Sequence, residues 1–180
     1  MQDKLNVFLS SEQKEFERDR INIAKQISRI QFLSCKPLET SGASPIDVEE
    51  ASILGARNCD IYIGIFGTRY SSMVTKEYNE AIKKFKPAFI YVKKLEDRER
   101  DKKLNRFLNN RVKLNFKMHF FISNMDLRRK INDNLTEYIV NLLRDGLKQY
   151  SSTKRKAKRE AIAGHKKAQK AFRTGQGDLP

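Results

Sequence analysis

The sequence has few of the residues from which metal sites, disulfides and membrane spans are built. Tryptophan is absent, and the two histidines, His119 and His165, have no second histidine or cysteine at a helical ligand spacing. This scarcity argues against a zinc site and against any mechanism that pairs a histidine with a nearby nucleophile. We therefore expect no bound metal and no resident cofactor.

Cysteine is almost as scarce. Cys35 and Cys59 each lie in an apolar segment, and there is no further cysteine to form a second pair. We expect two buried free thiols, which are typical of a reducing cytoplasm. No apolar run approaches the roughly 20 residues of a spanning helix, and residues 1–10 lack the basic and apolar regions of a signal peptide. The sequence therefore predicts a cytoplasmic protein that does not enter a membrane.

Positive charge is abundant but unevenly distributed. The 180 residues contain 37 Lys and Arg against 22 Asp and Glu, a formal net charge of +15. Residues 83–117 contribute a net +9 and residues 153–180 a net +7, whereas the rest of the chain has a net charge of −1. Both segments favour contact with nucleic acid or with an acidic partner, because they attract phosphates and carboxylates.

The apolar residues predict strands that alternate with helices along the first 150 residues. The predicted strands span residues 5–10, 32–38, 60–67, 87–92 and 119–122, and the predicted helices span residues 12–30, 45–58, 75–84, 96–114 and 126–150. Such alternation is typical of βαβ units. We expect a doubly wound, flavodoxin-like α/β domain over residues 1–150, with a five-stranded parallel sheet and helices on both faces. Residues 151–180 are expected to form a basic tail that is helical or disordered.

Polar and charged residues follow the predicted strands at their carboxyl ends. Ligands of open parallel sheets bind at this edge, because successive loops converge there. The residues expected there are Ser10 and Ser11 after the first strand, Glu39 after the second, Gly67, Arg69 and Tyr70 after the third, and Glu77 in the helix that follows. Neither a P-loop nor a complete glycine-rich dinucleotide motif is present.

Each of these charged side chains also has a purely structural interpretation. Glu77 would stabilise the first turn of a helix capped by Thr75. Asp60 would end the preceding helix and start the third strand. Arg69 has the shape and charge to bind a phosphate or a carboxylate, but a salt bridge to Glu39 or Glu77 would explain it equally well. The residues alone leave both interpretations open.

Several of these segments together resemble one family. They are residues 7–11 (VFLSS), 19–20 (DR), 60–70 (DIYIGIFGTRY) and 75–78 (TKEY). In this order they are similar to the TIR-like domain of unknown function, a relative of TIR domains and nucleoside deoxyribosyltransferases. The similarity runs from about residue 5 to residue 92. Ser71 stands where the family usually has glycine and Glu12 where it usually has threonine. We therefore expect the loop after Tyr70 to have a different shape.

The resemblance implies a reaction and a set of roles. Among the wider relatives, a glutamate at the start of a helix acts on an N-glycosidic bond; here that catalytic residue is Glu77, with Ser10 and Asp60 near the sugar. Arg69 would bind a phosphate, and Tyr70 would stack on a base. The other residues implied in substrate binding are Ser11, Glu39 and Gly67. The implied substrate is a nucleotide or an NAD-like molecule, cleaved in a defence or signalling context.

Two other functions stay open on the sequence. One is a non-catalytic module that binds a nucleotide signal or a protein partner. The other is a basic protein that binds nucleic acid through residues 83–117 and 153–180. The sequence also leaves open the identity of the substrate and whether the chain forms a homo-oligomer.

Overall fold

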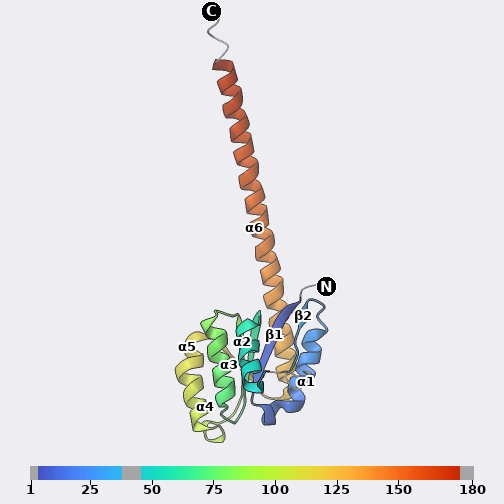
Figure 1. Cartoon of the computed structure of the whole chain (residues 1–180), viewed down its shortest axis with the longest axis vertical. Coiled ribbons are helices and arrows are strands. Elements are labelled where there is room, and N and C mark those ends of the chain that lie inside the picture. The colour runs from blue at the N-terminus through green and yellow to red at the C-terminus, as the bar shows by residue number, and fades with distance from the viewer. Residues whose placement is uncertain (1–3, 38–45, 175–180) are drawn as a thin grey trace, which may run out of the picture. The chain divides into compact units, whose positions relative to one another are not determined.

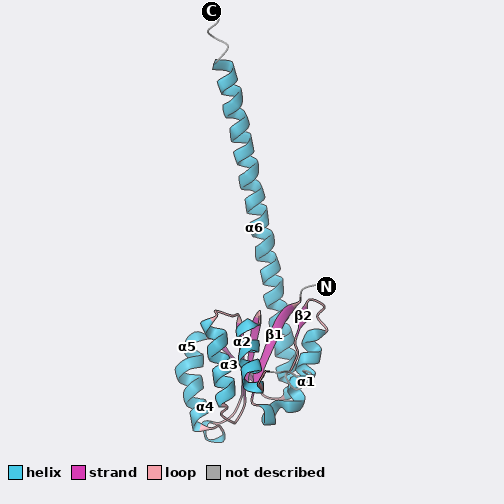
Figure 2. Ribbon diagram, viewed as in Figure 1, coloured by secondary structure: helices cyan, strands magenta, loops and turns pink. Residues whose placement is uncertain are grey.

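The computed structural model contains a five-stranded sheet in which each strand runs parallel to its neighbours (Figure 1 and Figure 2). The structure describes residues 4–37 and 46–174, with side chains described as far as residue 164. The strands are β1 (Leu5–Ser11), β2 (Leu33–Ser34), β3 (Ile61–Phe66), β4 (Ala88–Lys93) and β5 (Met118–Phe121). Their order in the sheet is β2-β1-β3-β4-β5. The predicted five-stranded doubly wound fold is confirmed.

Helices cover both faces of this sheet. They are α1 (Gln13–Ser28), α2 (Val48–Asn58), α3 (Ser72–Lys83), α4 (Lys102–Phe107), α5 (Lys113–Asn115) and α6 (Asn124–Thr174). A 3-10 turn (Asp97–Glu99) precedes α4, and a π-helical turn (Leu108–Val112) joins α4 to α5. The helices α2, α3 and α4 lie on one face of the sheet, whereas α1 and the first turns of α6 lie on the other. A hydrogen bond joins α1 to α6, because the Gln26 side-chain amide donates to the Arg128 carbonyl oxygen at 3.2 Å.

The core is centred on β3, whose six residues are all buried. A continuous apolar run of this kind is typical of a central parallel strand that is covered on both faces. On the face of α3 and α4, the Tyr78 ring packs edge-on against Tyr62 at 6.4 Å and against Phe107 at 5.2 Å, both measured between ring centroids. Apolar burial on this face fixes α3 and α4 to the sheet.

The predicted helix 96–114 is broken in the structure. Arg100 has an extended backbone, with φ −109° and ψ 142°, and it separates the 3-10 turn from α4. Asp101 then caps α4, because its Oδ1 accepts hydrogen bonds from the Lys103 amide at 2.6 Å and the Leu104 amide at 3.3 Å. The prediction of one continuous helix was wrong because tertiary contacts of Arg100, described below, override the local helical pattern.

Other boundaries also differ from those predicted. The helix α3 begins at Ser72 and is capped by Ser71, whose Oγ accepts from the Val74 amide at 3.3 Å, and not by Thr75. The strand β2 is only two residues long. The helix predicted over residues 45–58 begins at Val48 as α2, and Ile46, inside the predicted range, is 42% exposed. The predicted first residue of this helix, residue 45, lies outside the described residues.

The chain divides into two compact units, Met1–Asn132 and Asp133–Pro180. The helix α6 continues past residue 150 to Thr174, so the described part of the predicted basic tail is helical. Leu142 and Leu143, which belong to the helix predicted over residues 126–150, are exposed. The predicted domain boundary at residue 150 stays a prediction. Within the described residues, no helix combines the length and the apolarity that crossing a bilayer requires.

Candidate functional site

Glu77 lies at the centre of a buried polar cluster near the carboxyl end of β1. The residue is 5% exposed, and it is the only buried carboxylate among the residues that the structure describes. The Ser10 hydroxyl donates a hydrogen bond to Oε2 of Glu77, and the Ser52 hydroxyl donates one to Oε1. Ser10 and Ser52 are themselves 0% and 2% exposed. Two hydroxyl groups therefore hold both oxygens of a carboxylate that is largely withdrawn from water.

Three elements bring these side chains together. Because side chains alternate along a strand, Ser10 points to the same face of the sheet as Phe8, the face that α2 and α3 cover. The helix α2 can approach β1 closely because Gly55 has no side chain: a Cβ there would lie 2.7 Å from Cε2 of Phe8. This approach brings Ser52, one turn earlier in α2, within reach of α3. The sequence left open whether Ser10 and Glu77 meet, and the structure joins them directly.

Tyr62 of β3 lies beside this cluster. Burial raises the pKa of its phenol well above the ordinary value, the Glu77 carboxylate raises that pKa further, and the Ser10 hydroxyl opposes the shift. The phenol oxygen makes no hydrogen bond of ordinary geometry with the residues that the structure describes. The phenol therefore stays protonated and leaves a neutral O–H group next to the carboxylate.

A second carboxylate, that of Glu15, holds the loop that follows β3. Its Oε2 accepts hydrogen bonds from the amide and the hydroxyl of Thr68, both at 2.9 Å, and Nζ of Lys93 lies 3.8 Å from Oε1. Gly67 gives this carboxylate room, because a Cβ there would lie 2.2 Å from Oε1. Phe16, with φ −121° and ψ 16°, separates the turn that carries Glu15 from the rest of α1.

Arg100 holds the same loop from the other side. It is 9% exposed, its Nε donates to the Gly67 carbonyl at 3.2 Å, and its terminal nitrogens donate to the Lys93 carbonyl at 2.5 Å and to Oδ1 of Asn105 at 3.1 Å. Burial lowers the pKa of Arg100, while Asp97 and Glu15 oppose the change. Because arginine starts from a pKa above 12, the guanidinium stays charged. Residues 67–69 are thus anchored by groups of opposite charge.

Arg69 and Tyr70 have different surroundings at this edge. The Arg69 side chain is exposed and forms no salt bridge within the described part of the chain, so the alternative explanation by a bridge to Glu77 does not hold. Its amide donates to Oε2 of Glu15 at 3.4 Å. Tyr70 is half-buried and packs against the apolar cluster on the α3 and α4 face. Arg69 is therefore available to an anion, whereas Tyr70 contributes to packing.

The predicted site residues Ser11 and Asp60 are not brought to Glu77. The carbonyl and the hydroxyl of Ser11 both accept hydrogen bonds, at 3.2 Å, from the buried Arg20 of α1, on the opposite face of the sheet. Asp60 precedes β3, at the amino edge of the sheet, and its carboxylate accepts from the Asn6 amide at 2.7 Å. That placement agrees with the structural interpretation of Asp60. Glu39 lies outside the described residues.

Cys35 and Cys59 are buried free thiols, as predicted. Burial raises the pKa of Cys35 to about 12 and that of Cys59 to about 11, so neither is a nucleophile at neutral pH. In the described ranges, no three His, Cys, Asp or Glu side chains gather as the ligands of a metal would.

Four residues of these clusters were missed by the sequence analysis. Ser52 could have been found, because it is a small polar residue on the same side of α2 as Ala56, which is also fully buried. Tyr62 was treated only as part of a strand. Glu15 and Arg100 carry no local signal of this role, because the loop residues that they anchor, Thr68 and Gly67, are 53 and 33 residues away in the sequence.

This chain is similar to solved structures and to a protein-family model. A CMP N-glycosidase from Clostridium botulinum, BcmB, is similar in structure at 18% identity with a TM-score of 0.49, over 71% of this chain and 97% of BcmB. A de novo designed Rossmann 2x3 fold protein is similar at 14% identity with a TM-score of 0.43, over 76% of this chain and 91% of the design. No curated protein matches significantly. A family model described as a domain of unknown function, DUF4062, matches residues 6–136, most of the chain, and the protein therefore belongs to the DUF4062 family.

Proposed function

We propose that this domain cleaves the N-glycosidic bond of a nucleotide or an NAD-like molecule, with Glu77 as the catalytic carboxylate. The observation that carries the proposal is the pair of hydrogen bonds from Ser10 and Ser52 to the two oxygens of Glu77. Burying an ionised carboxylate costs several kcal/mol of folding free energy. Two hydrogen bonds to a charged group, at about 1.5–3 kcal/mol each, offset roughly that cost. Such an arrangement adds little net stability, which favours a role in chemistry.

The chemistry suits a single carboxylate. As the bond between C1′ and the base nitrogen breaks, its electron pair leaves with the base and positive charge develops on the ribose as an oxocarbenium ion. The negative charge of Glu77 would stabilise that ion. The oxygen of a water molecule then bonds to C1′ and releases a proton. A pyridinium base, as in NAD, leaves as a neutral molecule and needs no proton from a general acid.

Arg69 is the second residue in the proposal. It is exposed at the carboxyl edge of the sheet, in a loop that Glu15 and Arg100 anchor, and its guanidinium suits a phosphate. Asp60 is not part of the proposed site, because it lies at the amino edge of the sheet. Tyr70, packed against the core, is likewise not assigned to base stacking.

The test is turnover by purified full-length protein, wild type and Glu77→Gln, with NAD and a panel of nucleoside 5′-monophosphates. Released base is measured by chromatography. We expect Glu77→Gln to lower the rate by about 100-fold or more, because it removes the charge that faces the developing cation. Glu80→Gln is the matched control, since Glu80 lies one turn later in α3 and pairs with Arg57 and Lys83. Equal rates for wild type and Glu77→Gln would refute the role of Glu77.

A second function has an observation in its favour. Glu77 is only 5% exposed, and both its oxygens already have donors, which also suits a non-catalytic module whose ligand binds at the loop edge. Such a module would raise its melting temperature with a nucleotide that it does not consume, because a ligand that binds only the native state stabilises it. A thermal shift without released base would therefore favour binding over catalysis.

A further inference from the structure

The part of α6 that lies in the second unit carries a stripe of exposed apolar side chains. Leu143 is 63% exposed, Leu147 is 67% exposed, Tyr150 is 65% exposed and Val140 is 36% exposed. Scattered exposed leucines are common in proteins, but a contiguous apolar surface marks an interaction site. These four residues, here called the α6 stripe, are therefore the strongest candidate for a docking surface in this unit.

The spacing of the α6 stripe is that of a coiled-coil seam. Successive members are separated by three, four and three residues, which are the a and d positions of two consecutive heptads. At 3.6 residues per turn this spacing keeps all four side chains on one side of the helix. Leu142, although also exposed, falls outside the stripe. The geometry thus fits a second helix that lies along α6, with apolar residues at its own a and d positions.

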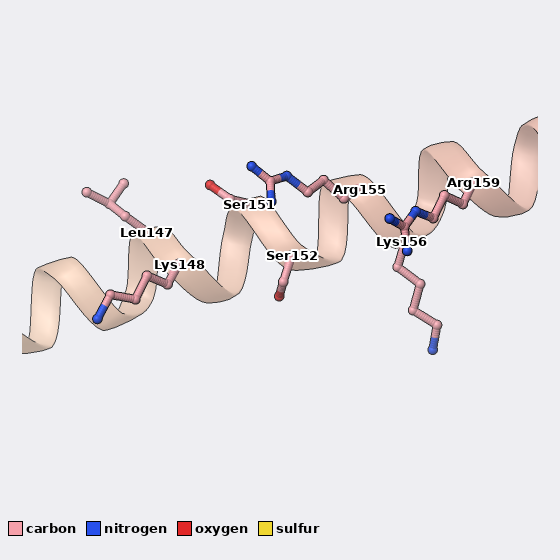
Figure 3. Close-up of a pocket in the computed structure, with 7 residues that line it drawn as sticks. All are labelled: Leu147, Lys148, Ser151, Ser152, Arg155, Lys156 and Arg159. Carbon is pink, nitrogen blue, oxygen red and sulfur yellow. The ribbon is translucent and has the colours of Figure 1, made fainter.

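The two flanks of the stripe differ in charge and size. One flank begins with Arg144, at an e position beside the seam, and the cations further round the helix are Lys148 and Arg155 at b positions and Arg159 at an f position. Figure 3 shows Leu147 and Arg155 on the same side of the helix and Lys156 on the other. Lys148 pairs with Asp145 at 3.0 Å, but the three arginines form no salt bridge with any side chain that the structure describes. The other flank has the small residues Gly146, Thr153 and Ala157, which allow a neighbouring backbone to come close.

We propose that the α6 stripe docks an acidic amphipathic helix of a partner protein. Its apolar residues would cover the stripe, and its glutamates or aspartates would face Arg144 beside the seam and be attracted by the net positive charge of the surrounding segment. Between residues 140 and 164 the chain has seven Lys and Arg against two Asp and Glu, so a second copy aligned on this segment would be repelled. Nucleic acid would account for the arginines, but it would leave the aliphatic stripe exposed to water.

The test uses the full-length protein and a fluorescein-labelled synthetic peptide of roughly four heptads, with leucine at a and d and glutamate at e and g. Binding is followed by fluorescence anisotropy. We expect the double variant Leu143→Ser, Leu147→Ser to bind at least about tenfold more weakly than wild type, because burial of the two leucines is lost. Leu142→Ser is the matched control and should bind as wild type does.

A second experiment tests the basic flank by reversing the charge of single side chains. Arg144→Glu, at the e position beside the seam, should weaken binding, whereas Lys156→Glu, on the side of the helix away from Leu147, should change it less (Figure 3). Circular dichroism of each variant checks that the helix is intact. The proposal is overturned if the peptide does not bind, or if the stripe variant binds as tightly as Leu142→Ser. It is also overturned if polyglutamate or single-stranded DNA of similar length binds as tightly as the peptide, or if the stripe instead drives self-association in sedimentation.

Discussion

The hydrogen bond between Ser10 and Glu77 is open to direct measurement by a double-mutant cycle. The perturbation is Ser10→Ala, made in the wild-type chain and again in Glu77→Gln. In the wild-type chain this change removes a hydroxyl that donates to a buried carboxylate. In Glu77→Gln the same hydroxyl can donate only to a neutral amide oxygen. The cycle therefore isolates the part of the hydrogen bond that depends on charge.

The expected size follows from the burial of both partners. A hydrogen bond to a charged group contributes about 1.5–3 kcal/mol to the free energy of unfolding, and one between neutral groups about 0.5–1.5 kcal/mol. Ser10 is 0% exposed and Glu77 is 5% exposed, so screening by water does not reduce these values. We expect Ser10→Ala to be more destabilising in the wild-type chain by about 1 kcal/mol, or about 2–4 °C in melting temperature for a chain of this length.

Tyrosine fluorescence during urea unfolding is the suitable assay, because the chain has no tryptophan and Tyr62 lies beside the cluster. Ser52→Ala, in the same two backgrounds, provides an independent measurement on the other carboxylate oxygen. Equal destabilisation by Ser10→Ala in both backgrounds would mean that the serine does not interact with a charged Glu77, and the argument from the buried carboxylate would fail.

Two further predictions concern titratable groups. Because burial raises the pKa of Cys35 to about 12 and that of Cys59 to about 11, a thiol-specific disulfide reagent at pH 8 should label the native protein far more slowly than the unfolded chain; rapid labelling of both thiols in the native state would contradict this. Burial, together with Lys117 and Lys130, lowers the pKa of His119 below its ordinary 6.5. As the pH falls through about 6.5, His119 therefore binds a proton in the unfolded chain before it does so in the folded protein, and the free energy of unfolding decreases. In His119→Gln this decrease near pH 6.5 should be smaller, as measured by urea unfolding at a series of pH values.

The sheet could be predicted because its signals are local. The segment DIYIGIFG has the continuous apolar run of a central strand, and the alternation of strands and helices limits the topology to few choices. The pairing of Ser10 with Glu77 was only suggested by resemblance and topology. Its third member, Ser52, depends on how closely α2 approaches β1, which is a tertiary property.

The failures have the same physical origin. Residues 96–114 have helical periodicity, but Arg100 leaves the helix to bind the backbone carbonyls of Lys93 and of Gly67, the latter 33 residues away in the sequence. Asp60 was grouped with the site because it belongs to the same sequence motif as Arg69. A strand of six residues nevertheless separates the two, so they lie at opposite edges of the sheet. Long-range contacts and strand length decide such cases, and a sequence motif encodes neither.

The double anchoring of residues 67–69 has a consequence for recognition at Arg69. Glu15 fixes the amides of this loop and Arg100 fixes the carbonyl of Gly67, so the backbone is already ordered before any ligand arrives. A ligand that binds Arg69 would need to restrict only the rotamers of one side chain, and the entropy of ordering a loop would not oppose its binding. Affinity at this edge would then respond to changes at positions 15 and 100, although neither side chain would touch the ligand.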